Sequence, residues 1–109
     1  MSTKRLTGKV ALIAGSASGI GAAIAKRFVE EDAIVVMTDK NKEKGEAVCK
    51  DIGASEFITA DFRFREEVKA VVEETEKNYK KLDIFVNSVG MMFSKDFMNC
   101  YFSFILYKY

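Results

Sequence analysis

Short apolar runs alternate with amphipathic segments over the first 90 residues of the chain. Four runs have the length and the apolar or β-branched content of buried strands, at 9–14, 33–38, 56–60 and 83–87. Three segments between them have helical spacing of apolar residues, at 19–31, 41–52 and 65–80. This alternation predicts an α/β fold, a doubly wound parallel sheet with helices on both faces, and right-handed crossovers give the strand order 3-2-1-4.

Each predicted helix has an apolar face that would pack on the sheet. The first places Ile20, Ile24 and Phe28 four residues apart along one side. The second directs Ala47 and Val48 inward. The inward face of the third consists of Val68, Val71, Val72, Thr75 and Tyr79.

The second helix also has recognisable ends. Asn41 precedes it, and its side chain can cap the first backbone amides. Gly53 follows it and supplies a C-terminal stop. These ends support a helix from Asn41 to about Ile52.

A glycine-rich turn joins the first strand to the first helix, and residues 14–21 read A-G-S-A-S-G-I-G. The first turn of a helix has backbone N–H groups without partners and a partial positive charge, so phosphate binds well there. Gly15 would permit the tight turn, Gly19 the close approach of a pyrophosphate, and Gly21 the close packing of helix on strand. The spacing is G-x-x-x-G-x-G, and the lysine of a P-loop is missing.

This glycine spacing resembles that of the short-chain dehydrogenase/reductases, from about Leu6 to Gly90. The segment Asn87-Ser88-Val89-Gly90 is similar to the family's N-N-A-G, with Ser88 in place of the second Asn. Ala14 stands where the family usually has Thr. The resemblance implies a Rossmann-like NAD(P)-binding unit at residues 1–90, about half of a family domain. It also implies descent from oxidoreductases that transfer a hydride between nicotinamide and an alcohol or ketone carbon.

The resemblance further implies a cofactor site at the carboxyl ends of the strands. Asp39 would accept hydrogen bonds from the adenosine ribose and repel a 2′-phosphate, so NAD is expected over NADP even though Lys40 follows. Asp61 would accept from the adenine amino group, with the Phe62 backbone beside the ring. An ordinary strand-end carboxylate is the alternative for either aspartate. The expected cofactor-binding residues are Gly15, Ser18, Gly19, Ile20, Gly21, Asp39, Asp61, Phe62, Asn87, Ser88 and Gly90.

The groups that carry out hydride transfer in the family are not found in this sequence. The family uses a Ser on a fifth strand and a Tyr-x-x-x-Lys on the next helix, with the Tyr as general acid/base. No tyrosine here has a lysine four residues later, and there is no histidine. Cys49 and Cys100 lack metal-like spacing. We therefore expect no catalytic residue, no metal and no turnover by this chain alone.

Residues 91–109 differ in composition from the rest of the chain and are rich in aromatic residues. They do not resemble the family's continuation, so we expect a truncated product. An interaction tail that docks on a partner or a membrane surface is the alternative. Without a fifth strand, the apolar fourth strand would lie at an exposed edge, so the chain is expected to self-associate.

Composition and charge narrow the remaining functions. The net charge is +1, which gives no reason to expect nucleic acid as a partner. No leader or run of bilayer-spanning length is visible, so a cytoplasmic protein with reduced thiols is expected. A non-catalytic dinucleotide-binding or interaction module remains the alternative to an enzyme. S-adenosylmethionine is a third candidate ligand, but the glycine spacing together with residues 87–90 argues against it.

Overall fold

The structure, a computed structural model of the 109-residue chain, describes residues 4–17 and 19–88. Strands and helices alternate along these ranges. They are β1 (Val10–Ala14), α1 (Gly19–Glu30), β2 (Ile34–Asp39), α2 (Lys42–Ile52), β3 (Glu56–Thr59), α3 (Arg65–Tyr79) and β4 (Ile84–Asn87). Each element was predicted, and the predicted ends agree with these bounds to within one residue.

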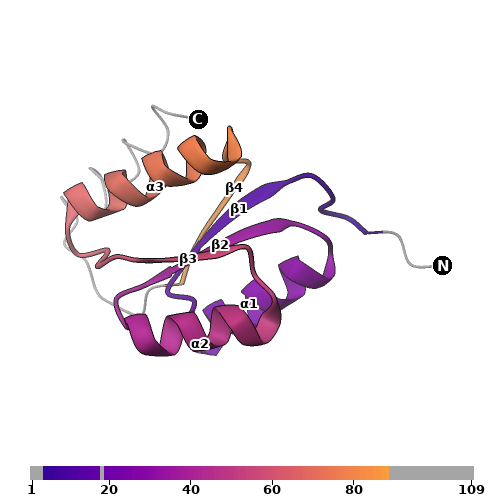
Figure 1. Cartoon of the computed structure of the whole chain (residues 1–109), viewed down its shortest axis with the longest axis horizontal. Helices are drawn as coiled ribbons and strands as arrows, with labels where there is room; N and C mark the ends of the chain where they lie inside the picture. The colour runs from indigo at the N-terminus through magenta and orange to yellow at the C-terminus, as the bar shows by residue number, and fades with distance from the viewer. Residues whose placement is uncertain (1–3, 18, 89–109) are drawn as a thin grey trace.

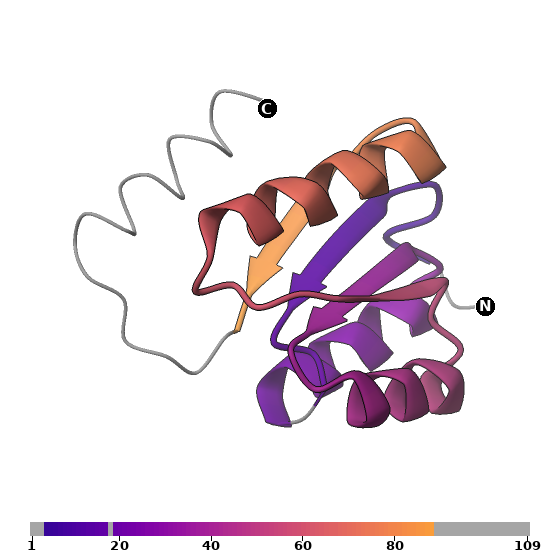
Figure 2. The same ribbon diagram turned by 60° about the vertical axis from the view of Figure 1, so that its left-hand side comes forward.

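The four strands form one parallel sheet in the order β3-β2-β1-β4, as the alternating pattern predicts. Helix α3 covers one face of this sheet, and α1 and α2 lie on the other (Figure 1; Figure 2). β1 occupies the interior of the sheet, where Leu12 pairs in register with Val36 on one side and Phe85 on the other. All five residues of β1 are buried, which explains why this strand is apolar throughout.

Alternating residues of the strands supply two separate hydrophobic cores, because successive side chains point to opposite faces of a sheet. The core under α3 contains Val10, Leu12, Ala14, Val36, Ala60, Phe62, Val68, Val71, Val72 and Leu82. The core under α1 and α2 contains Ile13, Ala25, Val35, Met37 and Cys49. The predicted inward face of α3 is confirmed, because Val68, Val71, Val72 and Thr75 are buried and Tyr79 packs against the same core.

Helix α2 has the predicted ends, and its predicted inward face is confirmed at Val48, which packs against the core. The Asn41 side chain accepts a hydrogen bond from the Lys44 N–H at 3.1 Å, and Gly53 follows the helix with a φ of +74°. The prediction that Ala47 faces inward is wrong, because Ala47 is exposed. Gly45 faces the sheet instead, and a Cβ atom there would overlap the Phe57 ring of β3. The Phe57 ring therefore occupies the space that a side chain at position 45 would need.

The predicted apolar face of α1 is correct only in part. Ile24 and Phe28 pack against the core, but Ile20 is 75% exposed. Ile20 belongs to the first turn of α1, immediately after the glycine turn that follows β1. Helical spacing puts these residues on one side of the helix, but α1 reaches the core only after its first turn.

Candidate functional site

The glycine turn after β1 is anchored on the end of β2. Gly15 has a φ of +76°, a conformation that favours glycine, and its N–H donates to the Thr38 carbonyl at 2.9 Å. The Ser16 hydroxyl donates to the same carbonyl at 3.2 Å and is fully buried. The turn therefore has a conformation fixed by its neighbour in the sheet.

Gly19 and Gly21 meet different demands at the start of α1. Gly19 has a φ of +60°, and the position of a Cβ atom there faces open space. At Gly21 a Cβ atom would overlap the Gly15 carbonyl and the Ser88 hydroxyl. The first leaves the helix N-terminus accessible, and the second lets the helix pack closely against the turn. Ser18, the remaining predicted residue of the turn, lies outside the described residues.

Ser88 connects the end of β4 to this turn. Its N–H donates to the Ala14 carbonyl at 2.9 Å, and its hydroxyl oxygen lies 2.9 Å from that carbonyl oxygen and 3.2 Å from that of Gly15. Asn87 precedes it, is exposed, and pairs in register with Ala14. Gly90 lies outside the described residues. Ser88 thus links the end of β4 to the backbone of the turn through hydrogen bonds.

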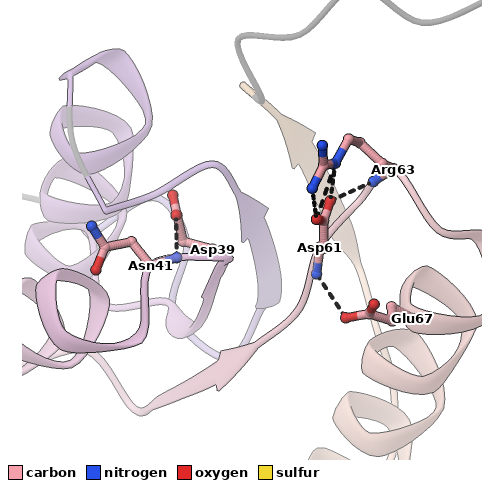
Figure 3. A network of polar contacts seen from close by, with 5 residues as sticks. All are labelled: Asp39, Asn41, Asp61, Arg63 and Glu67. Atoms are coloured by element: carbon pink, nitrogen blue, oxygen red, sulfur yellow. Dashed lines mark hydrogen bonds and ion pairs between the residues drawn. The ribbon is translucent and has the colours of Figure 1, made fainter.

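Asp39 ends β2 and joins the glycine turn to the start of α2. One carboxylate oxygen accepts from the Ala17 N–H at 3.1 Å. The other accepts from the Asn41 N–H at 2.9 Å (Figure 3). A carboxylate has about four acceptor positions, so these two bonds leave room for further donors. Since Asp39 is only partly buried, a ligand at the sheet edge can reach it.

The carboxylate of Asp61, beyond the end of β3, is occupied by Arg63. The Arg63 Nε lies 3.0 Å from both oxygens, and Nη2 lies 2.6 Å from Oδ2 (Figure 3). The Arg63 backbone N–H donates to Oδ1 at 3.0 Å. These hydrogen bonds lower the pKa of Asp61 to about 2. Asp61 is ionised and already bound by a cation before any ligand arrives.

Further contacts hold the loop between β3 and α3. Glu67 accepts from the Asp61 N–H at 2.9 Å (Figure 3), and the Phe64 N–H donates to the Asp61 carbonyl at 3.1 Å. Arg63 lies over the Phe64 ring, 5.7 Å from its centroid, and Phe64 is 51% exposed. The side chain of Phe62, by contrast, is buried and stacks on Phe85 with ring centroids 6.3 Å apart.

The structure places most of the predicted residues at one edge of the sheet. Gly15, Asp39, Asp61 and Asn87 follow or end parallel strands, so they share its carboxyl edge. Arg63 and Glu67 were not predicted to take part. The only signal in the sequence was an arginine two residues after a strand-end aspartate. Neither strand nor helix periodicity brings two residues at this spacing in a loop together.

No metal site accompanies this edge in the part of the chain that the structure describes. Residues 4–17 and 19–88 contain no group of three or more histidine, cysteine, aspartate or glutamate side chains placed to hold an ion. Among the same residues, no helix has both the length and the apolar character to cross a membrane.

Comparison with known proteins connects this architecture to one family. The family model described as short chain dehydrogenase matches residues 9–102. A protein called short chain aldehyde dehydrogenase 1 from Euphorbia lathyris is 44% identical over 92 residues, which are 82% of this chain and 32% of that protein. The L-fucose dehydrogenase of Bos taurus is 38% identical over 86 residues, 79% of this chain and 32% of that protein.

Solved structures agree with the sequence matches. The 3-ketoacyl-(acyl-carrier-protein) reductase of Brucella melitensis, complexed with NADH, superimposes with a TM-score of 0.70 at 40% identity. That match covers 74% of this chain and 34% of the reductase. The chain thus spans about a third of the length of the relatives it matches. The family match ends at residue 102, and the predicted domain boundary at Gly90 stays a prediction.

Proposed function

The chain belongs to the short chain dehydrogenase family of NAD(P)-dependent oxidoreductases, and we propose that its glycine turn and Asp39 bind NAD in preference to NADP. The observation that carries this proposal is the hydrogen bond from the Ala17 N–H to Asp39, 3.1 Å long. It brings an anion-binding turn and a hydroxyl-binding carboxylate together at one end of the sheet. A dinucleotide offers a pyrophosphate and a ribose, the two groups that such a turn and such a carboxylate would bind.

The pyrophosphate would bind at the N-terminus of α1. Residues 19–22, the first turn of that helix, include no acidic side chain that would repel an anion. The unpartnered amides and the helix dipole favour negative charge there. The open space at Gly19 admits a phosphate without contact from a Cβ atom.

The adenosine ribose would bind at Asp39. Two backbone amides use about half of the acceptor positions of the carboxylate, so both ribose hydroxyls can donate to it. A 2′-phosphate would bring a second negative charge to the same place, which disfavours NADP. Lys40 reduces this repulsion without removing it.

We further propose that these 109 residues bind the dinucleotide without transferring a hydride. The sequence has no Tyr-x-x-x-Lys, the pair to which the family resemblance assigns proton transfer. Relatives named as dehydrogenases and a reductase support oxidation–reduction chemistry for proteins of full family length, and the family resemblance assigns it to an alcohol or ketone carbon. A module that binds the dinucleotide for another purpose is the alternative.

The test is a titration with NADH, NADPH and S-adenosylmethionine. We expect NADH to bind most tightly, which can be followed through its own fluorescence, and S-adenosylmethionine to show no heat in a calorimeter. An alcohol-oxidation assay with NAD, run on the same preparation, should show no turnover. If NADH does not bind, the proposed function is wrong; if it is oxidised or reduced, the proposed inactivity is wrong.

We also propose that the chain self-associates and that it resides in the cytoplasm. β4 is an end strand of the sheet that the described residues form, and an apolar end strand favours pairing with another chain. Cys49 is a free thiol, in keeping with a reducing compartment, whereas Cys100 lies outside the described residues. Light scattering tests the first proposal, and imaging of a fluorescent fusion tests the second.

A further inference from the structure

Arg63 holds the carboxylate that the family resemblance assigns to the adenine amino group. We propose that Arg63 withdraws Asp61 from base recognition, so that this chain holds the base by stacking and does not distinguish adenine from hypoxanthine. The inference rests on the proposed dinucleotide site, and it concerns how that site recognises the base of the dinucleotide.

The contacts at Asp61 leave little capacity for another donor. Nε and Nη2 of Arg63 approach the two oxygens at distances of 2.6 to 3.0 Å, and the Arg63 N–H adds a contact of 3.0 Å to Oδ1. These contacts occupy most of the roughly four acceptor positions of a carboxylate. An adenine amino group would have to displace a charged donor in order to bond to Asp61. A neutral donor replaces a charged one at a loss, because charge-assisted bonds are the stronger kind.

The backbone of the loop is held in a conformation that places Arg63 next to Asp61. The Phe64 N–H closes a turn on the Asp61 carbonyl at 3.1 Å, and Glu67 holds the Asp61 N–H at 2.9 Å. Because these two bonds fix the backbone of the turn, the side chains of its first and third residues, Asp61 and Arg63, point toward each other (Figure 3). The Asp61 side chain is only 16% exposed, so solvent competes weakly for its oxygens.

The same loop presents flat surfaces at the edge of the sheet. The Arg63 side chain is 51% exposed and lies over Phe64, which is itself half exposed. Arginine planes and aromatic rings stack on any base, because every base has a π-face. Stacking does not detect whether the exocyclic group is an amine or a carbonyl.

The experiment compares NADH with reduced nicotinamide hypoxanthine dinucleotide, in which a carbonyl replaces the amino group. For the wild-type chain we expect the two dissociation constants to agree within about threefold, since no hydrogen bond distinguishes them. In Arg63→Ala the carboxylate loses the guanidinium and keeps only the bond from the residue 63 backbone N–H. NADH should then bind at least about tenfold more tightly than the hypoxanthine analogue, as expected for a bond to a charged acceptor. Asp61→Ala combined with Arg63→Ala should return the ratio to the wild-type value.

Arg65→Ala is the matched control, because it removes an exposed arginine two residues further along and should leave the ratio unchanged. The inference would be overturned if the wild-type chain bound NADH more than about tenfold more tightly than the hypoxanthine analogue, or if the ratio of the two dissociation constants were unchanged in Arg63→Ala. In either case, binding of NADH would still support the proposed site. Absence of binding by either dinucleotide would instead refute the proposed function, and the inference with it. An NMR titration of Asp61 gives an independent readout: its pKa should be about 2 in the free wild-type chain and should rise in Arg63→Ala. An unchanged pKa would also overturn the inference.

Discussion

Asp39→Ala is the substitution that tests the proposed site most directly. In the free chain this carboxylate accepts the Ala17 N–H at 3.1 Å and the Asn41 N–H at 2.9 Å. In the complex it would also accept two ribose hydroxyls. The substitution therefore has two effects. It removes a hydrogen bond that holds the glycine turn, and it removes the proposed hydrogen bonds to the ribose.

The expected loss of binding energy is about 1.5–3 kcal/mol, the scale of hydrogen bonds to a charged group. That loss corresponds to a dissociation constant for NADH raised about 10- to 150-fold. NADPH should lose less, because the charge that repels its 2′-phosphate disappears with the carboxylate. The preference for NADH over NADPH should therefore shrink in Asp39→Ala.

Isothermal titration calorimetry measures both affinities, and urea unfolding of the same samples reports the conformational part. Asp39→Asn is the informative partner, because its amide oxygen accepts one of the two backbone bonds while the charge is gone. Asp51→Ala, an exposed aspartate in α2, is the neutral control. If Asp39→Ala bound NADH as tightly as Asp51→Ala does, the assignment of the ribose to this carboxylate would be wrong.

The remaining predictions concern the packing and the charges around the site. Gly21→Ala should lower the free energy of unfolding by about 1–3 kcal/mol, because its methyl group would overlap the backbone of the turn; an unchanged urea midpoint would contradict this. Ser88→Ala should cost about 0.5–1.5 kcal/mol in the same assay and should loosen NADH binding, so full wild-type stability would argue against its link to the turn. The Val10 N–H and Lys81 lower the pKa of Asp83, so this carboxylate stabilises the fold at pH values above its unfolded pKa of about 3.9. The contribution is lost as the pH falls through the lower folded pKa. Urea unfolding curves of the wild-type chain should therefore differ from those of Asp83→Asn at pH 5 and approach them at pH 2.5. Size-exclusion chromatography should show species larger than a monomer, and a sharp monomer peak would refute self-association.

Much of the fold follows from local patterns that tertiary contacts do not override. The four apolar runs and three amphipathic segments admit one parallel arrangement, and Asn41 and Gly53 mark helix ends through bonds made within a few residues. Ile20 shows the limit of such reasoning. Its position in the helical repeat indicates a buried side, but burial also requires a sheet beneath it, and the first turn of α1 lies beyond that contact.

The positions of the candidate site residues could be predicted where the ends of strands determine them. The hydrogen-bond partners of their side chains could not. Asp39 ends β2 and Asp61 lies just beyond β3, so the parallel sheet brings both to its carboxyl edge. What each carboxylate binds depends on loop geometry. Asp39 meets the backbone of the glycine turn, whereas Asp61 meets the guanidinium of Arg63. No periodicity encodes a pair two residues apart in a loop, so this contact required the structure.

The hydroxyl of Ser88 has a consequence for the order in which the molecule can assemble. It reaches back 74 residues to the Ala14 carbonyl, and β4 joins β1 only after the chain through α3 has been made. Contacts between residues so distant in sequence form late, because closing a long loop costs entropy first. Among the described residues, the proposed phosphate site would thus be complete only once β4 has joined β1. A dinucleotide that recognises only the completed site would act as a folding ligand, adding about 2.7 kcal/mol to the native state at a hundred times its dissociation constant.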